Sequence, residues 1–139
     1  MDFFGYEAIF KKKLKKSYRF IEKKYKLTKN ELMIISYLAE NKENNLSSDI
    51  VKNLGFTKSH VSLSVSSLIK SGYLHSISNP QDKKKLHLIL KEKASAIISE
   101  ISLIKKNFEK QLFSDFSESE KKQFTSLLQK LIKNAKQKE

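Results

Sequence analysis

Three serines spaced at intervals of three and four residues form the most distinctive polar pattern in the sequence. On a helix, Ser59, Ser62 and Ser66 would lie on one face, opposite an apolar stripe. Small hydroxyl groups allow close approach to base edges and phosphates, and Lys58 and Lys70 flank them. We therefore predict that this face contacts DNA. The alternative interpretation is a solvated, serine-rich helix surface.

A second cluster consists of three consecutive lysines, Lys83, Lys84 and Lys85. They follow Pro80 in a segment with the composition of a turn, so we expect a long basic hairpin tip that reaches DNA phosphates. Asp82 could pair with Lys84 to hold this turn. The alternative is a basic loop that only contacts solvent.

Leu63 lies off the apolar stripe of the same predicted helix, where it could touch a thymine methyl group. Packing against the hairpin or the first helix is an equal alternative. The full set of predicted DNA-binding residues is Ser47, Thr57, Lys58, Ser59, His60, Ser62, Leu63, Ser66, Lys70, Lys83, Lys84 and Lys85.

Other chemistries have weaker support. His75 and His87 could face each other across the hairpin and, with His60, could provide three imidazole ligands for a metal ion. However, no acidic or cysteine partner stands at ligand spacing, so we expect no metal and no cofactor. Phosphate-binding glycine loops and hydrolase motifs are missing, and we expect no enzymatic activity. Phe10, Tyr18 and Tyr25 could line a pocket for an aromatic effector, but core or dimer packing is favoured.

These residues must be positioned by helices, because only three glycines and one proline interrupt the chain. Apolar residues recur every three or four positions from Phe3 to Tyr25, which predicts a long helix. Thr28 and Glu31 fit a capping box for a second helix from about Lys29 to Ala39. A polar loop from Asn41 to Asn45 follows.

The middle of the chain predicts a helix-turn-helix followed by a hairpin. Ser47 is expected to cap a short helix that Gly55 ends, and Thr57 to cap a longer one that Gly72 ends. Two runs rich in aromatic and aliphatic residues, Tyr73–Ser78 and Leu86–Leu90, then predict two strands.

The last third is again predicted to be helical. One apolar stripe runs from Ala94 to Leu112. A capping box at Ser117 and Glu120 opens a second stripe from Phe124 to Ile132. We expect the tail from Asn134 to Glu139 to fray.

The amino-acid composition excludes several classes of function and favours others. The 139 residues carry 28 basic and 15 acidic side chains, giving a net charge of +13 and favouring a polyanionic partner. Arg19 is the only arginine, and lysine reads guanine less well than arginine does. The lack of cysteine excludes disulfides and thiolate chemistry. With no apolar run of transmembrane length and no signal-like start, we expect a cytoplasmic protein.

The segment from Leu54 to Val61, continuing through Leu68 and Gly72, resembles the helix-turn-helix of the MarR (multiple antibiotic resistance regulator) family. Asn79-Pro80-Gln81-Asp82-Lys83-Lys84 is similar to the family's wing motif. The sequence departs from the family in having lysines for the wing arginines, Lys91 for a threonine, Ala94 for a glycine, and Leu63 where an arginine is frequent.

The resemblance implies a mainly α fold with a small β-hairpin wing: a winged helix-turn-helix plus a helical dimerisation region. Within one domain spanning residues 1–139, residues 28–91 would bind DNA and residues 1–27 with 92–139 would form a homodimer. Two winged helices would then bind a pseudo-palindromic operator.

We therefore expect a transcriptional regulator, a homodimeric repressor released by a small aromatic or amphipathic effector. One rival is an architectural DNA-binding protein without operator or effector. Another is a peripheral membrane protein that uses the basic first helix, although this would leave the helix-turn-helix and wing unexplained, so we expect no membrane partner.

Overall fold

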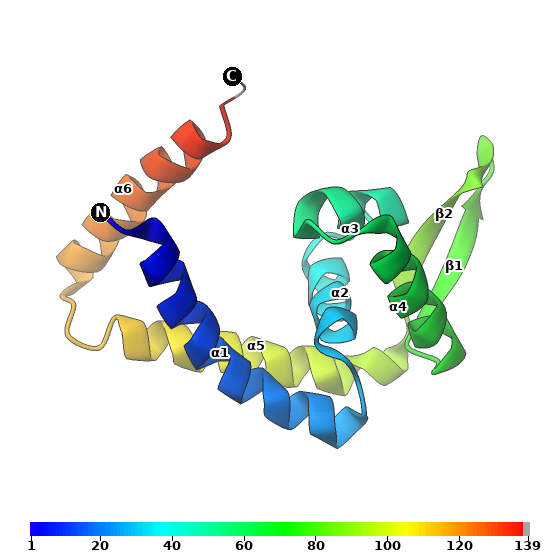
Figure 1. The fold of residues 1–139 in the computed structure, drawn as a ribbon, viewed down its shortest axis with the longest axis horizontal. Helices are drawn as coiled ribbons and strands as arrows, with labels where there is room; N and C mark the ends of the chain where they lie inside the picture. The colour runs from blue at the N-terminus through cyan, green and yellow to red at the C-terminus, as the bar shows by residue number, and fades with distance from the viewer. Residues whose placement is uncertain (138–139) are drawn as a thin grey trace. The chain divides into compact units, whose positions relative to one another are not determined.

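The computed structural model describes residues 1–137 and is mainly α-helical with one antiparallel hairpin, as predicted (Figure 1). A single turn of 3₁₀ helix, Glu92–Ala94, precedes α5. The regular elements are α1 (Phe3–Tyr25), α2 (Lys29–Glu40), α3 (Ser47–Leu54), α4 (Lys58–Lys70), β1 (Leu74–Asn79), β2 (Asp82–Leu90), α5 (Ser95–Leu112) and α6 (Glu118–Ala135).

The helix boundaries follow the local signals closely. Both halves of the predicted capping boxes form at Thr28 with Glu31 and at Ser117 with Glu120. Gly55 adopts the left-handed conformation that ends α3, with φ of 68°. The helix α6 continues to Ala135, past the expected start of fraying at Asn134, whereas residues 138–139 lie outside the described part of the chain.

One predicted cap is wrong. The N-cap of α3 is Leu46, and Ser47 is the first helical residue. The Asp49 carboxylate accepts a hydrogen bond from the Leu46 backbone N–H at 3.0 Å, which satisfies a donor at the helix start without a serine. Leu46 is also held in extended conformation by a β-bridge to His87.

The hairpin also differs from its prediction. Its turn is short, because the strands extend to Asn79 and from Asp82. Ser78 pairs with Leu86 while the next residue, Asn79, pairs with Asp82. The three lysines between Asp82 and Leu86 therefore have no partner on β1. They form a bulge within β2 rather than a long loop at the tip.

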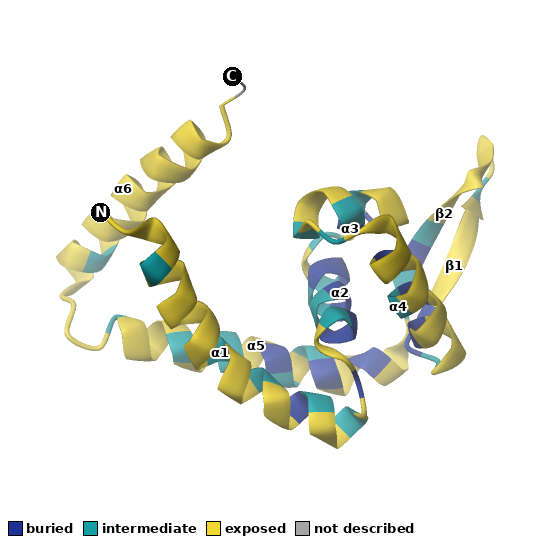
Figure 2. Ribbon diagram, viewed as in Figure 1, coloured by how far each residue is buried: buried dark blue, intermediate teal, exposed yellow. Residues whose placement is uncertain are grey.

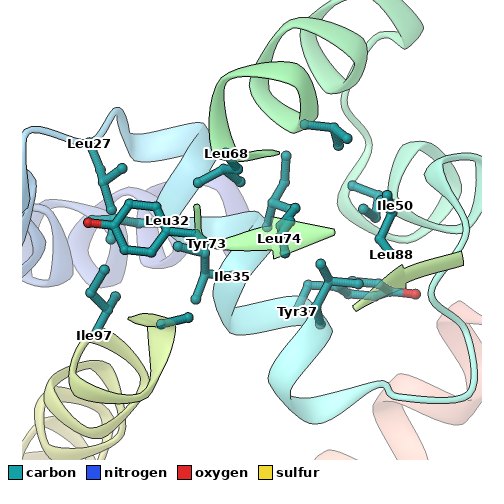
Figure 3. Packing of buried hydrophobic residues seen from close by; sticks show 14 of the residues in the cluster. Leu27, Leu32, Ile35, Tyr37, Ile50, Leu68, Tyr73, Leu74, Leu88 and Ile97 are labelled. Atoms are coloured by element: carbon teal, nitrogen blue, oxygen red, sulfur yellow. The ribbon is translucent and has the colours of Figure 1, made fainter. Parts of the chain in front are cut away.

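The described part of the chain forms two compact units, residues 1–104 and residues 105 onward. The first contains the hydrophobic core, to which α2, α4, the hairpin and the first turns of α5 contribute (Figures 2 and 3). Its most deeply buried side chains are Ile21, Ile34, Ile35, Ile50, Val61, Leu68, Leu74 and Ile97.

The second unit contains the end of α5 and the whole of α6. Three aromatic rings, Phe113, Phe116 and Phe124, pack edge to face around the turn between these helices, with centroids 5.0–6.1 Å apart. An ion pair joins Lys121 of α6 to Glu109 of α5 at 3.3 Å. No residue of α6 within the described part of the chain is buried (Figure 2).

Candidate nucleic-acid interface

The helix α4 presents the predicted serine face to solvent. Its opposite face carries Val61, Val65 and Leu68, which are 1%, 8% and 0% exposed. Burial of this apolar stripe fixes the rotation of α4 about its axis. Ser59, Ser62 and Ser66 are consequently exposed.

Both ends of α4 are fixed by hydrogen bonds. At the start, the Thr57 hydroxyl accepts a bond from the His60 backbone N–H at 3.2 Å, as predicted for an N-cap. At the end, the Lys93 ammonium donates to the Ser71 carbonyl at 2.7 Å and lies 4.6 Å from the Tyr73 ring centroid. A cation at this end also complements the helix dipole.

A buried carboxylate joins α4 to α2. Glu31 is 6% exposed, and its carboxylate accepts one bond from the Thr28 backbone N–H at 3.0 Å. It accepts another from the Ser67 hydroxyl of α4 at 3.1 Å. The capping box thus also sets the position of the serine-bearing helix.

The base of the hairpin is fixed by Asn45, which is 8% exposed. Its carbonyl accepts a bond from the Leu88 N–H at 2.9 Å, and its side-chain oxygen lies 2.6 Å from His87 Nδ1. His75 and His87 are not directly opposite each other in the hairpin, because His87 pairs with Ile77 and His75 with Ile89.

Two short side chains shape the basic end of the hairpin. Asn79 Oδ1 accepts from the Gln81 N–H at 2.9 Å, and Asp82 Oδ1 accepts from the Lys84 N–H at 3.1 Å. Asp82 therefore does pair with Lys84 at this turn, through the backbone N–H of Lys84.

All twelve predicted site residues are exposed. The structure brings most of them onto two elements, α4 and the β2 bulge, with Ser47 at the start of α3. Leu63 is 70% exposed, so it is not buried against the hairpin or α1. Between Thr57 and Leu90 the sequence has five lysines and a single acidic residue, Asp82. This surface is therefore strongly positive.

Sequence reasoning missed the residues that position this surface. The hydrogen bond from Ser67 to Glu31, the bonds of Asn45 and the Lys93 cap each join residues 22 to 43 positions apart. Only Glu31 had a local signal, its capping box. Among the described residues, no three His, Cys, Asp or Glu side chains are grouped as metal ligands would be.

Two helices joined by a short turn, α3 and α4, and followed by the β1–β2 hairpin, define a winged helix-turn-helix protein. A family model described as transcriptional regulator SarA/Rot matches residues 16–101. The chain therefore belongs to the SarA/Rot family of transcriptional regulators.

Two curated relatives are transcriptional regulators of the helix-turn-helix type. BilQ of Clostridioides difficile is 28% identical over 106 residues, which cover 76% of this chain and 71% of BilQ. SarU of Staphylococcus aureus is 27% identical over 121 residues, which cover 80% of this chain. This chain spans about half of SarU, 49% of its length.

Solved structures confirm the resemblance to MarR regulators at the level of the fold. A MarR family regulator of Listeria monocytogenes, complexed with a 26mer DNA, superposes with a TM-score of 0.82 at 20% identity, covering 96% of this chain and 89% of that one. The S. aureus MepR–DNA complex gives a TM-score of 0.76 at 18% identity, covering 96% and 98%. Within residues 1–137, no helix is long and apolar enough to cross a membrane.

Proposed function

We propose that this protein is a sequence-specific DNA-binding regulator that acts as a homodimeric repressor and is released by a small-molecule effector. The observation that carries the proposal is the exposed polar face of α4, fixed at both ends and followed by a basic bulge with one nearby acid. Residues 28–91 would bind DNA, and residues 1–27 with 92–139 would form the dimer.

In the proposed mechanism, α4 enters the major groove while the lysines of the bulge contact phosphates of the same duplex. The bulge suits this role, because Lys83, Lys84 and Lys85 are not needed for pairing with β1. The serines, with Thr57 and His60, would contact base edges and nearby phosphates.

Dimer formation is supported by apolar side chains left exposed outside residues 28–91. On α1 these include Phe3, Phe4 and Phe10, between 45% and 85% exposed. On α6 an entire stripe is exposed. Faces of this kind are typical of helices that pack against another subunit.

An effector is supported by a pocket of 440 Å³ beside the wing, a volume suitable for a small organic ligand. Apolar residues of α2, β2 and α5 line it, among them Leu38, Leu88 and Ile98. Lys42, Lys91 and Glu92 also line it, and the excess of lysine over glutamate would favour an anionic, amphipathic ligand. Benzoate provides a simple aromatic probe, and we expect it to lower the affinity for duplex DNA.

The experiment that tests DNA binding combines selection from a random duplex pool with charge reversal of the bulge. We expect the wild-type protein to select a pseudo-palindromic sequence. The double substitution Lys83→Glu with Lys84→Glu should weaken binding to every duplex. It should also make the affinity less dependent on salt. The slope of log affinity against log salt concentration should become less negative by about 0.9 for each phosphate that the variant no longer neutralises.

A matched control is Lys12→Glu with Lys16→Glu, which makes the same change of charge on the exposed face of α1 opposite Leu14. This variant should retain more affinity than the bulge variant. If the bulge variant bound duplexes as tightly as wild type at about 150 mM salt, the assignment of the wing would be wrong.

The abundance of lysine also favours a second candidate, an architectural protein that binds DNA without an operator. The same selection separates the two functions. Recovery of a palindrome supports the regulator, whereas an unselected pool bound as tightly as any single sequence supports the architectural protein.

A further inference from the structure

The side chain of Leu63 is the one large apolar group near the centre of the polar face of α4. It is 70% exposed, and in the sequence it stands one residue from Ser62 and three from Ser66. An exposed leucine alone is ordinary on a protein surface. Leu63 differs from an ordinary exposed leucine because it lies on the helix that would face the bases.

Between its two terminal lysines, α4 lacks the side chains that read bases by paired hydrogen bonds. The helix sequence, Lys58 to Lys70, contains no arginine, asparagine, glutamine, aspartate or glutamate. Arginine and lysine can read guanine, asparagine and glutamine read adenine, and acidic residues read cytosine. The two lysines stand at the first and last positions of the helix.

Apart from the exposed His60, whose imidazole can also bond to a base edge, the remaining groups on this face are small hydroxyls, which can bond to many base edges and discriminate poorly. A leucine offers no hydrogen bond, but it can bury the C5-methyl group of thymine, the only apolar group that base pairs present in the major groove. Leu63 also lies in the N-terminal half of α4, the part of a recognition helix that contacts bases.

We propose that Leu63 is a specificity-determining residue that selects thymine by packing against its methyl group. The preferred ligand is a duplex with a thymine at one fixed position in each half-site. This inference rests on the proposed DNA-binding function and adds the chemical feature that is read.

The experiment replaces each thymine of a selected duplex, one position at a time, by deoxyuridine. This change removes the methyl group and leaves the base-pairing edge intact. We expect the wild-type protein to lose about fourfold in affinity at the thymine read by Leu63, the value for one buried methyl group. Leu63→Ala should bind the thymine and uracil duplexes equally.

The matched control is Leu103→Ala, which makes the same substitution at an exposed leucine of α5. It should keep the wild-type ratio between thymine and uracil duplexes, even if its absolute affinity changes. Because Leu63 is exposed, its alanine variant should fold normally, which circular dichroism checks.

The outcomes separate this inference from the function on which it rests. If the wild-type protein binds duplexes but no uracil substitution weakens binding, or if Leu63→Ala retains full discrimination, the role of Leu63 is overturned. If no duplex is bound at all, the proposed function fails and the inference fails with it.

Discussion

Glu31 shows how a single buried residue can fix a surface to which it does not itself belong. Its carboxylate accepts bonds from the Thr28 N–H and from the Ser67 hydroxyl, and it is 6% exposed. Ser67 lies next to Ser66, one of the serines predicted to contact DNA. The orientation of α4 therefore depends on an acid that lies 36 residues earlier in the chain.

We predict that Glu31→Ala destabilises the protein by about 1–3 kcal/mol, because it removes both hydrogen bonds of a buried side chain, one of which is half of the capping box. Ser67→Ala, which spares the capping box, should cost only about 0.5–1.5 kcal/mol. Urea unfolding of the two variants measures the difference. A destabilisation by Glu31→Ala no larger than that by the exposed Glu43→Ala would contradict this account.

At the scale of elements, the helices and the presence of a hairpin could be predicted from the sequence, but the register of the hairpin could not. Thr28, Gly55 and Thr57 act on backbone groups within four residues of themselves, so their effects can be read locally. The pairing of β2 depends instead on Asn45 and Leu46, which bond to His87 and Leu88 about 42 residues away. No local pattern specifies such a register.

The candidate site also has one part that the sequence predicts and one part that it does not. The exposure of its predicted residues follows from helical periodicity, which places polar side chains opposite a buried stripe. The bulge does not follow from this periodicity, because it depends on the strand register, in which Asn79 pairs with Asp82 while Ser78 pairs with Leu86. The exposure of the lysines agrees with the prediction, but their location within β2 does not.

Another interaction between elements ties the end of α1 to α5. The Lys24 ammonium donates a hydrogen bond to the Glu100 carboxylate. This hydrogen bond, followed by the one from the Tyr25 hydroxyl, lowers the pKa of Glu100 below its ordinary value of 4.5. The same bond to Glu100 raises the pKa of Lys24 above 10.5.

We predict a pH-dependent change of stability from this ion pair. A carboxyl group with a lower pKa in the folded state stabilises the protein above its unfolded pKa, and this stabilisation disappears as pH falls through the folded pKa. Wild type should therefore be more stable than Glu100→Gln at neutral pH, and the difference should vanish as pH falls well below 4.5. Urea unfolding across this range measures it, and a difference that stays constant with pH would contradict the prediction.

At the scale of the whole molecule, the distribution of burial is uneven. The core lies in residues 1–104, whereas α6 has no buried residue in the described part of the chain. Its exposed apolar stripe consists of Phe124, Leu127, Leu128, Leu131 and Ile132, each between 43% and 62% exposed. A helix of this kind gains little stability from its own chain.

We predict that Leu128→Glu with Leu131→Glu dissociates the proposed homodimer. Burying one leucine contributes about 1.5–3 kcal/mol. Because the variant loses two leucines, the dissociation constant of the dimer should rise by about a hundredfold or more. Sedimentation equilibrium measures the change. Ser126→Glu adds a negative charge to the polar side of the same helix and should leave the dimer intact. A wild-type protein that sediments as a monomer would contradict the proposal.

The bare apolar stripe of α6 has a consequence for how the protein would respond to its own abundance. If α6 is completed only by a second copy, the dimer concentration rises as the square of the chain concentration when most chains are monomeric. Occupancy of a palindromic site would then rise steeply around a threshold. Modest changes in synthesis or degradation would act as a switch, before any ligand is bound.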